Sequence, residues 1–271
     1  MLHDGRQFFE SFNPMSTPYS SVLDLFSLHG RRALITGGSK GLGRSIAIAL
    51  AQAGAEVVIV SRTLSECQAV AATINSISDS KATALAADVT RTDDRDRLLH
   101  EAGTIDILVN SAGVNIRNPI ETLDEKDWDA VLNVNLKSPF LLAQQFGPPM
   151  AARGWGRIVH LGSILSTISL AGRSPYASSK AGLLGLTRTL ALEWATQGVT
   201  VNALCPGPFA TEMNKPLLDN PEQYAAFISK IPMGRWGDLN EITGAALFLA
   251  SPASSFMTGN ALYIDGGWTA Q

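Results

Sequence analysis

The chain has 271 residues, of which 45% are hydrophobic, and it carries a formal net charge of −3. A chain of this length and apolar content can bury a large core as a single α/β domain. Charges of both signs are scattered without a long basic run, which argues against a nucleic acid or a membrane surface as partner. No run approaches the ~18 consecutive apolar residues of a membrane span. We therefore expect a small-molecule partner.

The first 25 residues lack the pattern of a basic stretch followed by an apolar one that marks a signal peptide. Asp4 and Glu10 also argue against a transit peptide, because such peptides are poor in acidic residues. We expect residues 1–25 to form a loosely ordered extension and residues 26–271 to form one domain. The only cysteines, Cys67 and Cys205, are interpreted as packing residues, which favours a reducing, cytoplasmic compartment. No metal site is expected.

From Arg31 onward, short apolar runs alternate with longer segments of helical periodicity, as in βαβ units around a parallel sheet. The runs are continuously apolar, which indicates strands that are buried on both faces. The pattern predicts an α/β fold with a doubly wound, seven-stranded parallel sheet and helices on both faces. Strands are predicted at 32–36, 56–60, 82–87, 105–110, 156–163, 199–205 and 261–265, and helices near 42–53, 65–77, 92–101, 124–152, 175–197 and 239–250.

Residues 207–237 are the least regular part of this domain and are rich in proline. A long irregular segment at the carboxyl edge of a parallel sheet often closes over a ligand. We expect this segment to act as a lid over the substrate.

The first predicted strand runs directly into the glycine-rich stretch TGGSKGLG at 36–43, and a helix follows. Gly37, Gly41 and Gly43 allow a tight turn, a close approach to a pyrophosphate and close packing of helix on strand. The helix N-terminus adds free N–H groups and a positive dipole. The spacing departs from G-x-G-x-x-G, and a tight turn without a ligand is the alternative interpretation of this motif taken alone.

The end of the second strand indicates which cofactor would bind. Dinucleotide-binding folds that take NAD place an acidic residue there against the ribose 2′-hydroxyl. Here Ser61 occupies that position, Arg62 follows, and Lys40 lies in the glycine-rich turn, with no acid expected nearby to repel a phosphate. Two cations can therefore converge on a 2′-phosphate, which favours NADP. The alternative is that Arg62 is a solvated loop residue.

Residues 174–182, SPYASSKAG, place Tyr176 and Lys180 one turn apart at the start of a predicted helix. Ser174 is expected to cap this helix, and Pro175 suits its first turn. A free tyrosine has a pKa near ~10, but an adjacent ammonium group and a positively charged nicotinamide would favour the phenolate. The pair could then act as an acid and a base, whereas an ordinary amphipathic helix is the alternative interpretation.

The motifs taken together resemble those of the short-chain dehydrogenase/reductase family. They are TGGSKGLG, DVT at 88–90, NSAG at 110–113, Asn135, Ser163, YASSK at 176–180 and PGPFATEM at 206–213. NSAG varies the commoner N-N-A-G, which puts a local turn hydrogen bond in doubt. The resemblance covers the chain from about Phe26 to Gln271, and it implies a single-domain Rossmann fold, an enzyme that interconverts a secondary alcohol and a ketone, and a homotetramer.

The resemblance also implies the site. The catalytic group would be Asn135, Ser163, Tyr176 and Lys180, with Tyr176 as acid/base, Ser163 orienting the substrate oxygen, Asn135 holding a water of a proton relay, and Lys180 holding the nicotinamide ribose. A strand-end cap and a satisfied core amide are the alternatives for Ser163 and Asn135. Cofactor contacts are expected from Gly37, Ser39, Lys40, Gly41, Leu42, Gly43, Ser61, Arg62, Asp88, Val89, Asn110, Ala112, Gly113, Tyr176, Lys180, Pro206, Gly207, Phe209 and Thr211.

The substrate is less narrowly indicated. VNIRNPIE at 114–121 and AGRSPYASSK at 171–180 resemble members that act on sugar acids, such as gluconate 5-dehydrogenases, while the remainder resembles 3-oxoacyl-carrier-protein reductases and general ketone reductases equally well. A carboxylate clamp by Arg117 and Arg173 is one interpretation, and solvated loop charges are the other. The residues expected to face the substrate are Arg117, Ser163, Leu165, Arg173 and Tyr176.

Two other classes of protein are alternatives to an oxidoreductase. A non-catalytic NADP-binding sensor could use the same fold, but it would have no need of the tyrosine and lysine. An epimerase or dehydratase of the extended branch of the family would resemble a different glycine spacing and a larger C-terminal region. Both are less favoured than an oxidoreductase.

Overall fold

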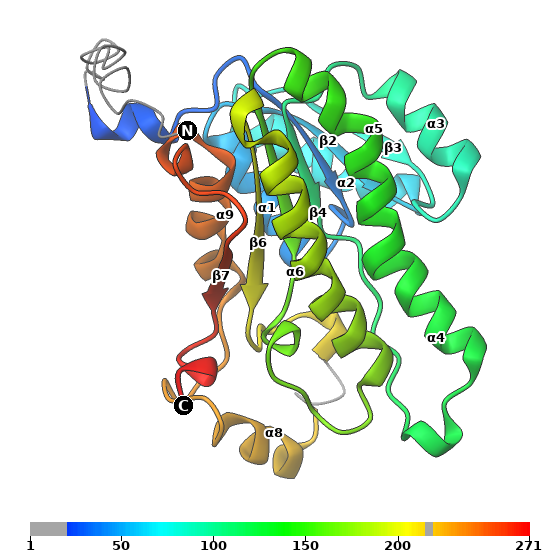
Figure 1. Cartoon of the computed structure of the whole chain (residues 1–271). Helices are drawn as coiled ribbons and strands as arrows, with labels where there is room; N and C mark the ends of the chain where they lie inside the picture. The colour runs from blue at the N-terminus through cyan, green and yellow to red at the C-terminus, as the bar shows by residue number, and fades with distance from the viewer. Residues whose placement is uncertain (1–20, 215–218) are drawn as a thin grey trace, which may run out of the picture.

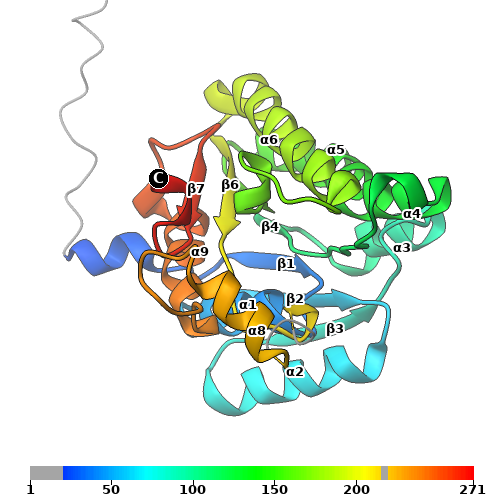
Figure 2. The ribbon, with the colours of Figure 1, turned by 90° about the horizontal axis from the view of Figure 1, so that it is seen from below.

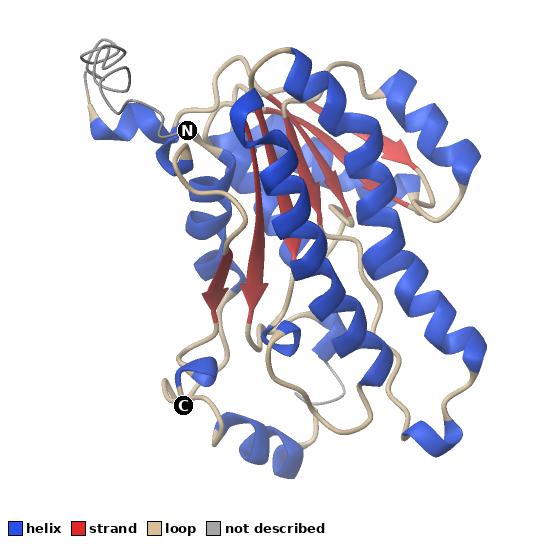
Figure 3. Cartoon of the chain, viewed as in Figure 1, coloured by secondary structure: helices blue, strands red, loops and turns tan. Residues whose placement is uncertain are grey.

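The computed structural model describes residues 21–214 and 219–271. In this part of the chain seven parallel strands form one sheet in the order β3-β2-β1-β4-β5-β6-β7. Figure 3 shows the strands as red arrows between blue helices. The strands are β1 (Arg32–Thr36), β2 (Glu56–Ser61), β3 (Ala82–Ala86), β4 (Ile107–Asn110), β5 (Gly156–Leu161), β6 (Val199–Pro206) and β7 (Ala261–Ile264). The strand order reverses between β1 and β4, the place where such sheets bind ligands.

Helices cover both faces of the sheet. Figure 2 shows α3, α4, α5 and α6 on one side of the strands and α1, α2 and α9 on the other. The helices are α1 (Gly41–Gln52), α2 (Leu64–Ile77), α3 (Thr92–Glu101), α4 (Glu125–Leu132), α5 (Ser138–Ala152), α6 (Ser174–Trp194), α8 (Pro221–Ile228) and α9 (Thr243–Ala250). The fold prediction is confirmed, and the predicted strands and helices agree with the structure to within a few residues.

Shorter helical turns connect these elements. A π-helical turn, η3 (Asn133–Lys137), joins α4 to α5, so the helix predicted as continuous over 124–152 has three parts. The 3₁₀ turns are η1 (Val22–Phe26), η2 (Ile120–Thr122), η4 (Ile164–Ser166), η5 (Ala195–Gln197), η6 (Glu212–Asn214), η7 (Leu239–Ile242), η8 (Pro252–Ser254) and η9 (Trp268–Ala270).

Side chains that alternate along each strand supply the two cores. On β1, Leu34 packs with Val58 and Leu108 beneath α5 and α6, while Ile35 packs with Ile59 beneath α1. Strands buried on both faces explain the unbroken apolar runs of the sequence. The rigid sheet then fixes where its carboxyl ends present their loops, and Figure 1 shows β6 and β7 pointing toward the end where α8 lies.

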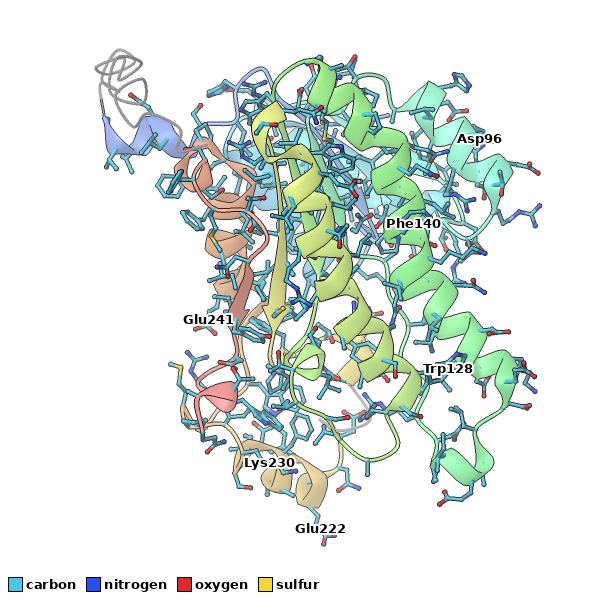
Figure 4. All side chains as sticks on the ribbon, in the orientation of Figure 1. Asp96, Trp128, Phe140, Glu222, Lys230 and Glu241 are labelled. Carbon is cyan, nitrogen blue, oxygen red and sulfur yellow. The ribbon has the colours of Figure 1, made fainter. Side chains whose placement is uncertain are left out.

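Glycine permits a close contact between α5 and α6. A Cβ on Gly147 of α5 would lie 2.2 Å from the ring of Trp194 on α6. Most of the large apolar side chains of α6 lie inside the subunit, because Leu183 and Leu190 are buried and Leu186 and Trp194 pack against the core. Phe140, labelled on α5 in Figure 4, and Leu192 stay exposed, at 43% and 82%.

The predicted extension and lid are described in part. Residues 1–20 and 215–218 lie outside the described residues, and Val22–Phe26 at the end of the extension forms a 3₁₀ turn capped by Ser21. Within the described part of the chain, no helix is both long enough and apolar enough to cross a membrane.

Candidate active site

The glycine-rich turn forms a cradle between β1 and α1. Gly37 has φ +64°, and a Cβ there would lie 2.9 Å from the backbone of Ala112. A Cβ on Gly43 would lie 2.3 Å from the Gly37 carbonyl oxygen. Backbone therefore packs on backbone, and any larger residue would close the turn. The Thr36 hydroxyl accepts hydrogen bonds from the N–H groups of Ser111 and Ala112, both at 3.2 Å, so the NSAG turn is held despite the serine at 111.

A cavity of about 700 Å³ runs from this cradle along the carboxyl ends of the strands to Tyr176. That volume is in the range of cofactor and ligand sites. All of the predicted cofactor residues line it except Asn110. They are Gly37, Ser39, Lys40, Gly41, Leu42, Gly43, Ser61, Arg62, Asp88, Val89, Ala112, Gly113, Tyr176, Lys180, Pro206, Gly207, Phe209 and Thr211.

Asn110 is the exception because of strand alternation. It is 3% exposed and its Nδ2 lies 3.1 Å from Nδ1 of His160, its register partner on β5. The side chain thus points into the layer beneath α5 and α6. Its neighbour Ser111 lines the cavity instead.

Several cavity residues were missed by the sequence analysis. They include Thr63, Glu66, Thr90, Val114, Asn133, Glu212 and Asn214. The signal for Glu66 was its place in the first turn of a helix that begins at the ligand-binding edge, where an acid is favoured by the helix dipole. Its neighbours in space come from another loop, and sequence spacing does not show them.

Glu66 corrects the expectation that no acid stands near the 2′-phosphate position. Its Oε1 lies 2.8 Å from Lys40 Nζ, and its Oε2 accepts a hydrogen bond of 3.2 Å from Ser39. Arg62 is exposed and, among the described residues, makes no ion pair. The Ser61 hydroxyl accepts from the Thr63 N–H and contacts Cys67, which turns it toward its own loop.

Tyr176 lies at the inner end of the cavity, in the first turn of α6. Burial raises the pKa of Tyr176. A hydrogen bond with Ser163 and the charges of Arg173 and Arg117 oppose that rise by favouring the phenolate. The effect predicted for Lys180 and the nicotinamide is therefore joined in the structure by two arginine charges that also favour the phenolate.

Lys180 lies one turn further along α6 and is 5% exposed. Its ammonium group donates to the Leu161 carbonyl at the end of β5 and lies 5.5 Å from the centre of the Tyr176 ring. Burial lowers the pKa of Lys180 to about 8. The predicted cap of α6 is wrong, because Ser174 is the first helical residue and its Oγ is buried without a partner among the described residues.

Ser163 and Asn135 complete the predicted group. Ser163 follows β5, is 7% exposed and accepts from the Leu165 N–H at 3.1 Å. Asn135, in the π-helical turn, donates to the Val114 carbonyl and to Ser179 and accepts from the Val114 N–H. Both N–H donors of its amide are therefore used, and one lone pair of Oδ1 is left for a water. The roles of both residues stay predictions.

Of the expected substrate residues, Ser163 and Tyr176 line the cavity, whereas Arg117, Leu165 and Arg173 do not. Burial lowers the pKa of Arg117, and burial together with repulsion from Arg117 lowers the pKa of Arg173 to about 10. Arg117 donates to Asn214, a cavity residue, over 3.4 Å. Arg173 Nη1 is buried without a hydrogen-bond partner among the described residues. Leu165 belongs to an apolar cluster that includes Tyr176 and Trp268.

Hydride transfer needs a nucleotide held at the carboxyl ends of the strands and a proton donor beside it. The cradle and the elongated cavity fit a dinucleotide, and Tyr176 supplies the titratable hydroxyl. These features define a dinucleotide-dependent oxidoreductase.

Known proteins identify the family. A family model described as enoyl-(acyl carrier protein) reductase matches residues 37–269. The gluconate 5-dehydrogenase of Gluconobacter oxydans (strain 621H) is 39% identical over 253 residues, which cover 91% of this chain and 97% of that protein. The 3-oxoacyl-(acyl-carrier-protein) reductase of Vibrio harveyi is 38% identical over 245 residues, covering 89% and 98%.

A crystal structure of a gluconate 5-dehydrogenase from Burkholderia cenocepacia J2315, in complex with NADP and tartrate, superposes with a TM-score of 0.87 and 38% identity, covering 93% of this chain and 100% of that one. The chain belongs to the short-chain dehydrogenase/reductase family, and it is an oxidoreductase that acts on CH–OH groups. The predicted family and enzyme class are confirmed, and the NADP held by this neighbour agrees with the predicted cofactor.

Proposed function

We propose that the chain interconverts the secondary alcohol and the ketone of a sugar acid with NADP(H), with Tyr176 as the acid/base. The main support is the pair of half-buried arginines, Arg117 and Arg173, whose charges act on the Tyr176 hydroxyl.

The cysteines bear on the compartment. Cys67 and Cys205 are both buried and unpaired, which supports the expected reducing, cytoplasmic compartment.

The residues of the cavity would hold NADP along its length. The backbone of Gly37 to Gly43 and the N-terminus of α1 would receive the pyrophosphate, and Arg62 and Lys40 the 2′-phosphate. The bound cofactor supplies or accepts the hydride. Lys180, anchored on the Leu161 carbonyl, would hold the ribose beside Tyr176.

Ser163 and Tyr176 would bind the oxygen that gains or loses a proton. In the oxidation direction the Tyr176 phenolate accepts the alcohol proton, and in reduction the phenol donates it. The Ser163 hydroxyl donates a hydrogen bond to the charge that develops on the substrate oxygen. Burial disfavours the phenolate, and the two arginines offset part of that cost.

The arginines would recognise the substrate carboxylate. An anion between two guanidinium groups stabilises both by offsetting their mutual repulsion, and guanidinium groups bind carboxylates through paired hydrogen bonds. Asn115 Oδ1 and Ser174 Oγ, which are close in sequence to Arg117 and Arg173, are also buried without partners among the described residues. A polyhydroxylated acid meets both needs.

A substrate panel tests the proposal. Gluconate-type acids, the corresponding uncharged polyols, a 3-oxoacyl thioester and simple ketones would each be assayed with NADP(H) and NAD(H). We expect the highest kcat/KM for the acids with NADP(H). Higher kcat/KM for the thioester would instead identify an acyl reductase, for which the apolar cluster of Leu165, Phe227 and Trp268 would be the binding surface.

Arg117→Ala isolates the clamp. Its kcat/KM should fall ~10²-fold or more for carboxylated substrates, mainly through KM, and little for neutral ketones. Arg188→Ala, which removes an exposed arginine of α6, is the matched control and should leave kcat/KM unchanged for both classes. Equal losses of Arg117→Ala on charged and neutral substrates would contradict the carboxylate role.

A further inference from the structure

Lys40 and Arg62, the two cations expected to bind the 2′-phosphate, differ in their ion pairing. Lys40 forms an ion pair of 2.8 Å with Glu66, and Glu212 lies 4.0 Å from the same ammonium group. Arg62, two residues before the start of α2, has no acidic partner among the described residues. One of the two expected phosphate ligands is therefore already engaged by a carboxylate of the protein.

The geometry shows that Glu66 is held in place from the glycine-rich turn. Both carboxylate oxygens are used, Oε1 by Lys40 and Oε2 by the Ser39 hydroxyl, and the residue stands in the first turn of α2. The Lys40 hydrogen bond lowers the pKa of Glu66, so the carboxylate is charged at neutral pH. Glu66, Ser39 and Lys40 all line the cavity, so a 2′-phosphate bound at this end would meet donors that the carboxylate already uses.

We infer that Glu66 competes with the 2′-phosphate of the cofactor for Lys40 and Ser39, and so sets how strongly the enzyme prefers NADP over NAD. This inference rests on the proposed use of NADP. To receive the phosphate, the Lys40 ammonium group must leave Glu66 or share its hydrogen bonds with both anions. NAD brings no second anion, so its binding leaves the pair intact. Glu66 therefore reduces NADP affinity selectively.

Two adenosine nucleotides that differ only in the 2′-phosphate isolate the contribution of this group to binding. We would titrate the purified full chain, without substrate, with 2′,5′-ADP and with 5′-AMP in a calorimeter. Glu66→Gln should tighten 2′,5′-ADP about threefold to tenfold, as expected for removing a partly exposed competitor, and change 5′-AMP by less than about twofold. The gain should shrink at high salt.

Two further variants make the assignment specific. Glu56→Gln removes an equal charge at the opposite end of β2, where Glu56 pairs with Arg32, and should leave both affinities unchanged. Lys40→Met should weaken 2′,5′-ADP, and adding Glu66→Gln to it should restore little, because the contested donor is gone. NADP and NAD titrations should follow the same order as these two nucleotides.

The outcomes separate this inference from the proposed function. Looser binding of 2′,5′-ADP by Glu66→Gln would show that Glu66 positions Lys40 for the phosphate and would overturn the competition. An equal gain in the presence and absence of Lys40 would overturn it as well. If the wild type bound 2′,5′-ADP no more tightly than 5′-AMP, the proposed NADP site would fail, and the competition would fail with it.

Discussion

At the scale of single residues, the chemistry of the site depends on opposing effects on one hydroxyl. Burial raises the pKa of Tyr176, while Ser163, Arg173 and Arg117 favour its charged form. The ammonium group of Lys180 is held beside Tyr176 by its hydrogen bond to the Leu161 carbonyl, in a position that lines the cavity. The two arginines are thus proposed to have two separable effects: they bind the substrate carboxylate, and they favour the phenolate of Tyr176.

Tyr176→Phe tests directly whether the Tyr176 hydroxyl transfers the proton. The substitution removes one hydroxyl and little volume, so we expect turnover to fall about 10²- to 10⁴-fold while NADPH binding stays nearly unchanged. Steady-state kinetics and titration of NADPH fluorescence measure the two effects. Turnover close to that of the wild type would remove Tyr176 from the mechanism.

The pH dependence of oxidation tests the effect of Arg173 on Tyr176. Oxidation needs the phenolate, so kcat/KM for a neutral alcohol should rise as the pH rises through the pKa of Tyr176. Arg173→Met removes a charge that favours the phenolate, which raises that pKa and moves the profile to higher pH. Arg173→Lys keeps the charge and should stay close to the wild-type profile. An unshifted profile for Arg173→Met would contradict this electrostatic role.

At the scale of elements, the contact between α5 and α6 depends on one glycine. Gly147→Ala would place a methyl group against the Trp194 ring and should destabilise the fold by about 1–3 kcal/mol. Gly185→Ala on α6 is the matched control, because no atom lies within 4 Å of its Cβ position, and it should stabilise by about 0.5–1 kcal/mol. Urea unfolding midpoints compare the two, and equal midpoints would contradict the packing argument.

Sequence reasoning succeeded where a feature is local. The apolar runs gave the strands, and the glycine-rich turn and the YASSK segment lie at the cavity as predicted. It failed where the feature depends on pairing between distant segments. The contact of Asn110 with His160 depends on the register of β4 with β5, and the Lys40–Glu66 ion pair joins the glycine-rich turn to α2. The π-helical turn at Asn133–Lys137 is a shift of backbone hydrogen bonds that composition does not encode.

At the scale of the whole molecule, the predicted tetramer would form over a small exposed apolar surface. Most apolar residues of α6 are core, and Phe140 and Leu192 are the exposed ones that support an interface over α5 and α6. We still expect light scattering to give about four times the chain mass of 28.8 kDa. Leu192→Arg should lower that mass because it places a charge on the same face. A wild-type mass of one chain would contradict the prediction.

The division of the site between backbone and loops bears on how such enzymes diverge. Close backbone contacts at Gly37, Gly43 and Gly207 shape the nucleotide half, so few substitutions there are tolerated. Arg117 and Arg173 lie on loops after β4 and β5, where a change of side chain leaves the sheet intact. Mutations in these loops can thus change the substrate that is bound while the nicotinamide cofactor stays the same. Relatives of nearly equal identity, one named for gluconate and one for an acyl carrier, are the expected products of that history.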